Sequence, residues 1–356
     1  MRKIIIVLSV LVLNATACGQ TRKTKNATSD TLSSENNGHE INYNNTKVLK
    51  TVYVVDRNGV EIRQDSDENS ELLGIYEYGT NLDVIEETEK WLGIRERIHR
   101  HFSKDGKKME RLAWEKVYVL KNKTGYFNEI KLITSDLNII LSLSVAGQAS
   151  EYFETGQPLN KYLKIELIDE PFFESKKSNA VDFLLADTTV IKKNNGTIEL
   201  PCQDKVVKYV DKPDAEDLRE EYHYVGQIEF LNQYLIVGSY WESWDYKFID
   251  KTSGEVTLLM GDYPYISPDK QTIICICTNP YESTADLELY SISDNNIKHI
   301  MSTSFKNWMP TVDKGEMFWC TDGYLYLTVN HANSFWKEDG SLNEKCQYVR
   351  IKIHKQ

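Results

Sequence analysis

Residues 51–133 contain a regular succession of short apolar segments and turns, and this stretch decides the fold. The segments read Val60-Glu61-Ile62-Arg63, Leu72-Leu73-Gly74, Tyr78-Gly79-Thr80, Leu82-Asp83-Val84-Ile85, Trp91-Leu92-Gly93-Ile94-Arg95 and Gly125-Tyr126-Phe127-Asn128-Glu129-Ile130. Such segments are typical of short strands that bury one face. Because short strands form a core only when their sheet curves round, the stretch predicts a small barrel in an all-β chain. We expect its core to contain Val52, Val54, Ile62, Leu73, Ile75, Leu82, Val84, Trp91, Ile94, Val117, Val119, Tyr126 and Ile130.

The same segments resemble the bacterial SH3-like domain. That family has an apolar-x-apolar-Arg strand, a Leu/Ile-Gly, a Gly-Thr turn, a Trp-x-x-Ile/Val strand and a final Gly-Tyr/Trp-apolar strand, and residues 51–133 show these features in that order. The resemblance implies a non-catalytic binding module and names no ligand. We expect a ligand groove on this barrel near Tyr78, Trp91 and Tyr126.

An insertion between residues 95 and 117 interrupts the pattern. Asp105-Gly106 lies between two alternating runs, which predicts a long β-hairpin that projects from the barrel. Residues 95–116 hold eight Lys/Arg and four Asp/Glu, a net charge of 8 − 4 = +4. In one interpretation Arg95, Arg97 and Arg100 bind a phosphate group or an anionic polymer. In the other, the charges only protect the exposed edges of the hairpin.

Two histidines of the insertion are the nearest approach to a metal motif. A strand projects residues i and i+2 from one face, so His99 and His101 lie together with Arg95 and Arg97. Zinc needs three or four ligands, and the spacing places no Cys or acidic residue beside the two histidines. The sequence therefore predicts no metal site and no cofactor.

The N-terminus predicts a lipoprotein. Arg2 and Lys3 precede an apolar run at residues 4–13, and Ala15-Thr16-Ala17-Cys18 follows, which resembles the bacterial lipoprotein cleavage box. Residues 1–17 would be the signal peptide, and Cys18 would carry the lipid. Residues 18–50 are polar without an apolar period and predict a flexible tether. Because the residues after Cys18 are not acidic, we expect a cell-envelope protein anchored in the outer membrane and facing the periplasm.

Residues 134–356 also have the pattern of strands, without a long helical period. Residues 224–356 show three units of four short strands each, which resemble the blades of a β-propeller. Residues 160–200 supply a degenerate fourth unit in one interpretation. In the other, the region is an open multi-blade stack or a sandwich.

The remaining chemistry favours binding over catalysis. The formal charge is −11, and −11 − 2 = −13 without Arg2 and Lys3, which argues against nucleic acid as a partner. The chain contains none of the common catalytic motifs. Five cysteines remain after Cys18, as buried apolar residues or partly as disulfides. Tyr240, Trp241 and Trp244 are either glycan contacts or core aromatics.

Two functions follow from these features. The first is a non-catalytic envelope lipoprotein, anchored in the membrane by its lipid, that binds cell-wall peptide or glycan of peptidoglycan through its SH3-like domain. The alternative is a protein-interaction scaffold or immunity-type lipoprotein, in which the propeller-like region contacts another envelope protein.

Overall fold

A computed structural model describes residues 39–104, 107–214, 218–311 and 316–354. The chain divides into two compact units, Met1–Glu129 and Ile130–Gln356. Strands dominate both units, so the all-β prediction is confirmed. Within the described ranges, no helix has the length and apolar character needed to cross a membrane. Cys18 lies outside the described residues, and the signal peptide and the lipid anchor stay predictions.

The first unit is a seven-stranded antiparallel sheet with the strand order β3-β2-β6-β5-β4-β1-β7. Its strands are β1 (Lys50–Val54), β2 (Val60–Arg63), β3 (Leu72–Tyr76), β4 (Asn81–Glu87), β5 (Trp91–Lys104), β6 (Lys107–Leu120) and β7 (Thr124–Gly125). Alternate residues of β1, β2, β4, β5 and β6 bury one apolar face in a common cluster, which includes Val54, Val60, Val84, Ile94 and Val117.

Two of the residues expected in this core are exposed. Ile75 precedes the buried Tyr76 in β3, so its side chain projects from the opposite face of the strand and is 52% exposed. Tyr126 follows the last strand of the sheet and is 73% exposed. Trp91 is buried, but the core cluster contains its neighbour Leu92 instead.

The predicted hairpin insertion is confirmed. Strands β5 and β6 pair continuously from Trp91 opposite Leu120 to Lys104 opposite Lys107. The tether prediction does not hold for residues 39–50, because this segment lies against the hairpin and then enters β1. The amide of Lys116 donates to the carbonyl of His39 at 2.7 Å, and that of Ile41 donates to Trp114 at 2.9 Å.

The second unit contains the predicted strands of all three repeat units. They are β14 (Glu220–Ile228), β15 (Gln233–Tyr240), β16 (Trp244–Asp250) and β17 (Val256–Met260), then β18 (Tyr265–Ile266), β19 (Thr272–Asn279), β20 (Thr284–Ser293) and β21 (Asn296–Phe305), and finally β22 (Trp308–Pro310), β23 (Met317–Cys320), β24 (Leu325–His331) and β25 (Gln347–Ile353). Every pairing between them is antiparallel.

Strands from the first part of this unit extend two of these sheets. The strands β8 (Ile139–Val145) and β9 (Glu151–Pro158) continue the sheet of β18–β21, next to β21. The strands β10 (Leu163–Ile168) and β11 (Ala180–Val181) are added to the two edges of the β25-β24-β23 sheet. Residues 160–200 therefore form no fourth four-stranded unit. The strands β12 (Thr197–Pro201) and β13 (Val206–Val210) pair only with one another.

The described part of this unit also contains a short α-helix, α1 (Glu170–Lys177), which the sequence interpretation missed. Asp169 caps the N-terminus of this helix, because the Asp169 carboxylate accepts a hydrogen bond from the backbone amide of Phe172 at 2.8 Å. Pro171 lies in the first turn. An N-cap Asp followed by Pro is a helix-start signal.

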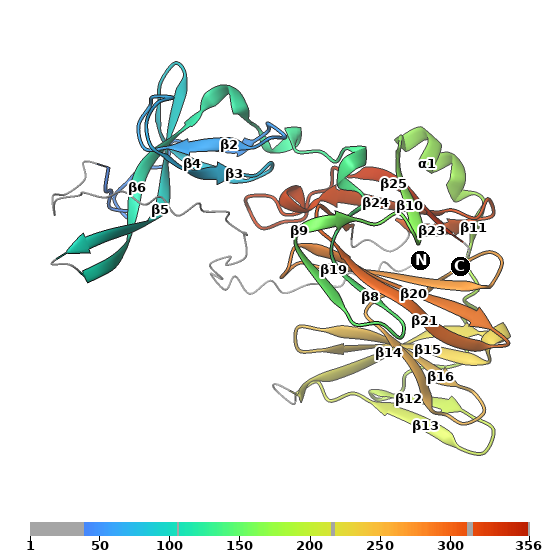
Figure 1. The fold of residues 1–356 in the computed structure, drawn as a ribbon. Helices are drawn as coiled ribbons and strands as arrows, with labels where there is room; N and C mark the ends of the chain where they lie inside the picture. Colours follow the sequence, from blue (N-terminus) through green and yellow to red (C-terminus); the bar gives the residue numbers. More distant parts are fainter. Residues whose placement is uncertain (1–38, 105–106, 215–217, 312–315, 355–356) are drawn as a thin grey trace. The chain divides into compact units, whose positions relative to one another are not determined.

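The sheets of the second unit follow one another in series (Figure 1), and apolar clusters join them. One cluster joins β12 to the β14–β17 sheet, the next joins that sheet to the β18–β21 sheet, and a third joins the latter to the sheet of β10 and β22–β25. Within the described residues, no cluster joins β14–β17 to β22–β25. The β14–β17 sheet packs on β19 and on parts of β20 and β21, including Ile292 and Ile297. Within the described residues, this contact includes no residue of β8 or β9.

Candidate functional site

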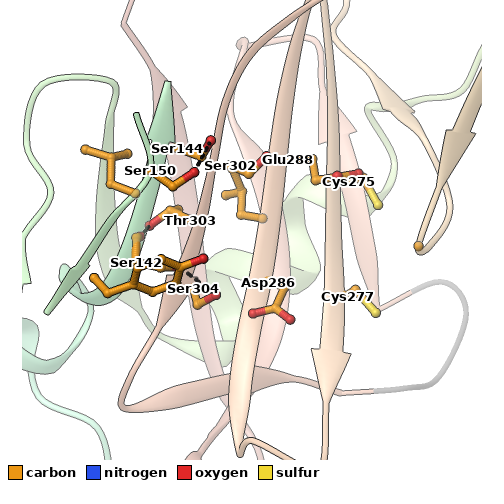
Figure 2. Close-up of a pocket in the computed structure, with 14 residues that line it drawn as sticks. Ser142, Ser144, Ser150, Cys275, Cys277, Asp286, Glu288, Ser302, Thr303 and Ser304 are labelled. Carbon is orange, nitrogen blue, oxygen red and sulfur yellow. Dashed lines mark hydrogen bonds between the residues drawn. The ribbon is translucent and has the colours of Figure 1, made fainter. Parts of the chain in front are cut away.

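A groove of about 360 Å³ lies on the same face of the β18–β21 sheet, where β8 and β9 extend it (Figure 2). The residues of its floor come from four neighbouring strands, β19, β20, β21 and β8, and Tyr152 of β9 adds an aromatic ring at one side. Since the other face of this sheet packs into the apolar core, the strand period leaves the polar residues facing outward.

The strand register arranges these residues in two parallel rows. In the first row, Cys275 pairs with Glu288, Glu288 with Ser302, and Ser302 with Ser144. In the second, Cys277 pairs with Asp286, Asp286 with Ser304, and Ser304 with Ser142, which in turn pairs with Tyr152. Each row thus runs from a thiol through a carboxyl group to two hydroxyl groups, as Figure 2 shows.

Hydrogen bonds hold the polar groups in place. The hydroxyl of Ser142 donates to that of Ser304 at 3.0 Å, and that of Ser150 donates to Ser144 at 3.1 Å. The carboxylate of Asp286 accepts from the amide of Asn279 and from the hydroxyl of Thr284, both at 3.0 Å. Each serine oxygen keeps a further lone pair for a ligand.

The groove carries negative and no positive charge of its own. Asp286 and Glu288 contribute its two carboxyl groups, and none of the described residues that line it is Lys or Arg. Burial raises the pKa of Glu288, and repulsion from Asp286 adds to this rise, while His299 acts against it. The groove therefore suits a neutral or cationic ligand better than an anionic one.

The two thiols at the end of the rows are unsuited to nucleophilic chemistry. Burial raises the pKa of Cys277 to about 12 and that of Cys275 well above its ordinary value. Both stay protonated near neutral pH, whereas a reactive cysteine is a thiolate. All five described cysteines are free thiols, so no disulfide forms among them.

Two of the three arginines predicted to bind an anion are held within the first unit. Arg95 forms two hydrogen bonds with Asp83, at 2.6 and 2.9 Å, and its guanidinium lies over the ring of Tyr43. Arg100 projects from the opposite face of β5 and forms an ion pair with Glu115 at 2.8 Å. Arg97 is exposed. The three arginines thus do not form one cationic face.

Of the three aromatic residues expected to line a ligand groove in the first unit, Tyr78 and Trp91 are held in contacts within that unit. The guanidinium of Arg57 lies 3.6 Å from the centre of the Tyr78 ring, and the Tyr78 hydroxyl donates to the carbonyl of Glu129 at 3.2 Å. Trp91 is buried, which leaves Tyr126 as the exposed aromatic ring of the three.

The aromatic loop of the second unit lies at the turn between β15 and β16. Trp241 and Trp244 are exposed there. Tyr240 is half-buried, and its hydroxyl donates to Asp245 at 3.0 Å. The two tryptophans can therefore contact a ligand, and Tyr240 is part of the local packing.

The sequence interpretation missed the groove, although a signal for it exists. Four strands carry a polar pair at positions i and i+2, and these pairs are Ser142 and Ser144, Cys275 and Cys277, Asp286 and Glu288, and Ser302 and Ser304. The pairing of β8 with β21, which brings the first pair to the others, joins segments about 160 residues apart and has no local signal. No family model matches the chain, and neither the curated proteins nor the solved structures include a significant match.

Proposed function

We propose that this chain is a non-catalytic envelope lipoprotein that binds a neutral glycan of the cell wall in the groove of its second unit. The observation that carries the proposal is the double row of carboxyl and hydroxyl groups across four strands. A sugar presents hydroxyl groups that both donate and accept. Ionised carboxyl groups accept hydrogen bonds, and serine hydroxyls do both, so the rows offer both kinds of partner at strand spacing.

The exposed ring of Tyr152 supports the same ligand class. It is 82% exposed and lies at one side of the groove, where an apolar sugar face can stack on it. An anionic polymer is disfavoured, because Asp286 and Glu288 would repel it and because two arginines of the hairpin are already paired.

The SH3-like assignment of residues 51–133 and the blade-like assignment of the second unit belong to this proposal. The first is supported by the order of the sequence segments and by the single antiparallel sheet that they form, and the second by three consecutive sets of four antiparallel strands. The serial clusters favour the open multi-blade arrangement over a closed propeller.

A protein-interaction scaffold is the second candidate function. The observation that favours it is the pair of exposed tryptophans, Trp241 and Trp244, at the β15–β16 turn. Tryptophan is enriched at protein interfaces because its large ring buries much apolar surface. In this case, Trp241→Ala would abolish capture of the partner and leave glycan binding unchanged.

Glycan binding can be measured with chitooligosaccharides, which are neutral oligomers of N-acetylglucosamine, one of the two sugars of the peptidoglycan glycan strand. We expect Tyr152→Ala and Asp286→Asn each to weaken the affinity of the full chain at least tenfold, which is about 1.4 kcal/mol. Tyr126→Ala is the matched control, because it removes an equally exposed ring from the other unit. The groove assignment fails if Tyr126→Ala weakens binding and Tyr152→Ala does not. Release of new reducing ends during the assay would contradict the non-catalytic part.

Membrane anchoring through Cys18 can be tested separately. Cys18→Ser should abolish incorporation of labelled fatty acid, because the thiol that would carry the lipid is gone. The protein should then leave the membrane fraction. The control is Cys346→Ser, which removes a half-buried thiol of the second unit and should change neither result. Unchanged labelling of the Cys18→Ser variant would contradict the anchor.

A further inference from the structure

The β5–β6 hairpin of the first unit brings together three possible metal ligands. His99 and His101 project from one face of β5, and their ring centres lie 4.7 Å apart. The register places Glu110 of β6 directly opposite His101. Within the described part of the chain, these three residues are the one group of His, Cys, Asp and Glu whose ligand atoms lie close enough to share an ion.

The distances within this trio match those between ligands of a tetrahedral ion. Nε2 of His99 lies 3.2 Å from one carboxylate oxygen of Glu110, and Nδ1 of His101 lies 3.3 Å from the other. Two ligands about 2.1 Å from a zinc ion at the tetrahedral angle are separated by about 3.4 Å. All three ligand atoms lie within 4.8 Å of one another, so a small rotation of the side chains brings them to distances at which they can bind one ion.

We propose that His99, His101 and Glu110 bind a late first-row divalent cation such as Zn²⁺. Imidazole nitrogens with one carboxylate suit Zn²⁺, Cu²⁺ and Ni²⁺, whereas Mg²⁺ prefers oxygen ligands only. Three protein ligands leave a fourth position, which water or a group of a second molecule completes. The three side chains are between 40% and 63% exposed, so this position is open to solvent.

Two basic residues on the other face of the hairpin do not compete for Glu110, because Arg111 forms its ion pair with Glu40 and Arg100 binds Glu115. Leu112 stands opposite His99 and supplies an apolar neighbour. The long paired ribbon holds β5 and β6 in register, which presets the three ligands. This site is independent of the glycan groove, which belongs to the other unit.

Metal binding is best measured by titration calorimetry on the full chain, without a polyhistidine tag and after chelator treatment. We expect one Zn²⁺ to bind per chain and Mg²⁺ not to bind at the same concentration. Co²⁺ should give the visible absorption of a tetrahedral site. His99→Ala, His101→Ala and Glu110→Gln should each lower the Zn²⁺ affinity at least tenfold. All three side chains are exposed, and an unchanged far-ultraviolet circular dichroism spectrum would show that the variants fold.

His223→Ala is the matched control, because it removes an exposed strand histidine from the other unit. It should bind Zn²⁺ like the wild type. The proposal is overturned if the wild type binds no Zn²⁺, or if the affinity survives in the three hairpin variants. It is also overturned if only the histidine variants lose affinity, since Glu110 would then be no ligand.

Discussion

Replacing Arg100 by Gln should lower the free energy of unfolding of the first unit by about 3–5 kcal/mol. The guanidinium donates to both carboxylate oxygens of Glu115, at 3.2 and 2.8 Å, and also to Glu71 at 3.1 Å. The side chain of Glu115 is only 4% exposed. Without Arg100, the negative charge of Glu115 would be buried and unpaired. This lowers the free energy of unfolding far more than loss of a surface ion pair does.

Hydrogen exchange of the amides of β5 and β6 would report this loss for the first unit alone. The exchange of the most protected amides should accelerate by a factor of 100 or more. Arg97→Gln is the matched control on an exposed neighbour and should change the free energy by less than about 0.5 kcal/mol. The double variant Arg100→Gln and Glu115→Gln should recover most of the loss, because no buried charge remains. Equal exchange in the Arg97 and Arg100 single variants would contradict the buried pair.

This ion pair shows where the sequence interpretation of the hairpin succeeded and where it stopped. Asp105-Gly106 lie outside the described residues, but β5 and β6 pair on either side of them as predicted. The alternation of β5 placed Arg95, Arg97, His99 and His101 on one face, whereas Arg100, which the interpretation grouped with the other two arginines, lies on the opposite face. The same turn also fixes the pairing of His101 with Glu110, so the third ligand of the trio was within reach of the sequence. The burial of Glu115 could not be predicted from the sequence, because it depends on how the hairpin packs against the segment around Glu71 and residues 39–41.

The second unit shows the same limit on a larger scale. The alternation of apolar residues and the turn residues predicted the strands of all three repeat units, because those signals act within a few residues. Strands β8 and β9 could not be assigned to β21 from the sequence. Antiparallel pairing of distant segments depends on which sheet edge is free, and no short pattern encodes that choice. The groove depends on this pairing, and it was missed for that reason.

A half-buried carboxyl group, Asp262, should make the second unit less stable as the pH rises. Burial raises its pKa from 3.8 to about 6, although a hydrogen bond from the amide of Tyr263 at 2.6 Å acts against the rise. Below pH 3.8 the group is protonated in the folded and unfolded chains, so it contributes no pH dependence there. Between pH 3.8 and 6 the unfolded chain ionises first. Above pH 6 the full penalty of about 3 kcal/mol applies.

Asp262→Asn removes this penalty and keeps the acceptor oxygen for the Tyr263 amide. Between pH 3.5 and pH 7.5, the stability of the variant relative to the wild type should therefore rise by about 3 kcal/mol. Calorimetric unfolding of the full chain should show this as a relative gain of roughly 6–12 °C in the melting temperature of the second unit. Other carboxyl groups oppose the trend in the wild type. One is Glu166, whose pKa is lowered by its hydrogen bond with Lys164 and by the charge of Arg350.

The contribution of those other groups to the pH dependence cancels in the comparison of Asp262→Asn with the wild type, because both proteins contain them. Asp204→Asn is the control, since Asp204 is exposed and its variant should follow the wild-type curve at every pH. If Asp262→Asn also runs parallel to the wild type between pH 3.5 and 7.5, the carboxyl group is hydrated in solution. A hydrated Asp262 would place water beside the contact between the turn after β17 and β19, where the main-chain amide of Asp262 donates to Sγ of Cys275 at 3.2 Å and its carbonyl accepts from that thiol at 3.4 Å. The same experiment therefore tests how tightly the β14–β17 sheet closes over β19, beside the groove.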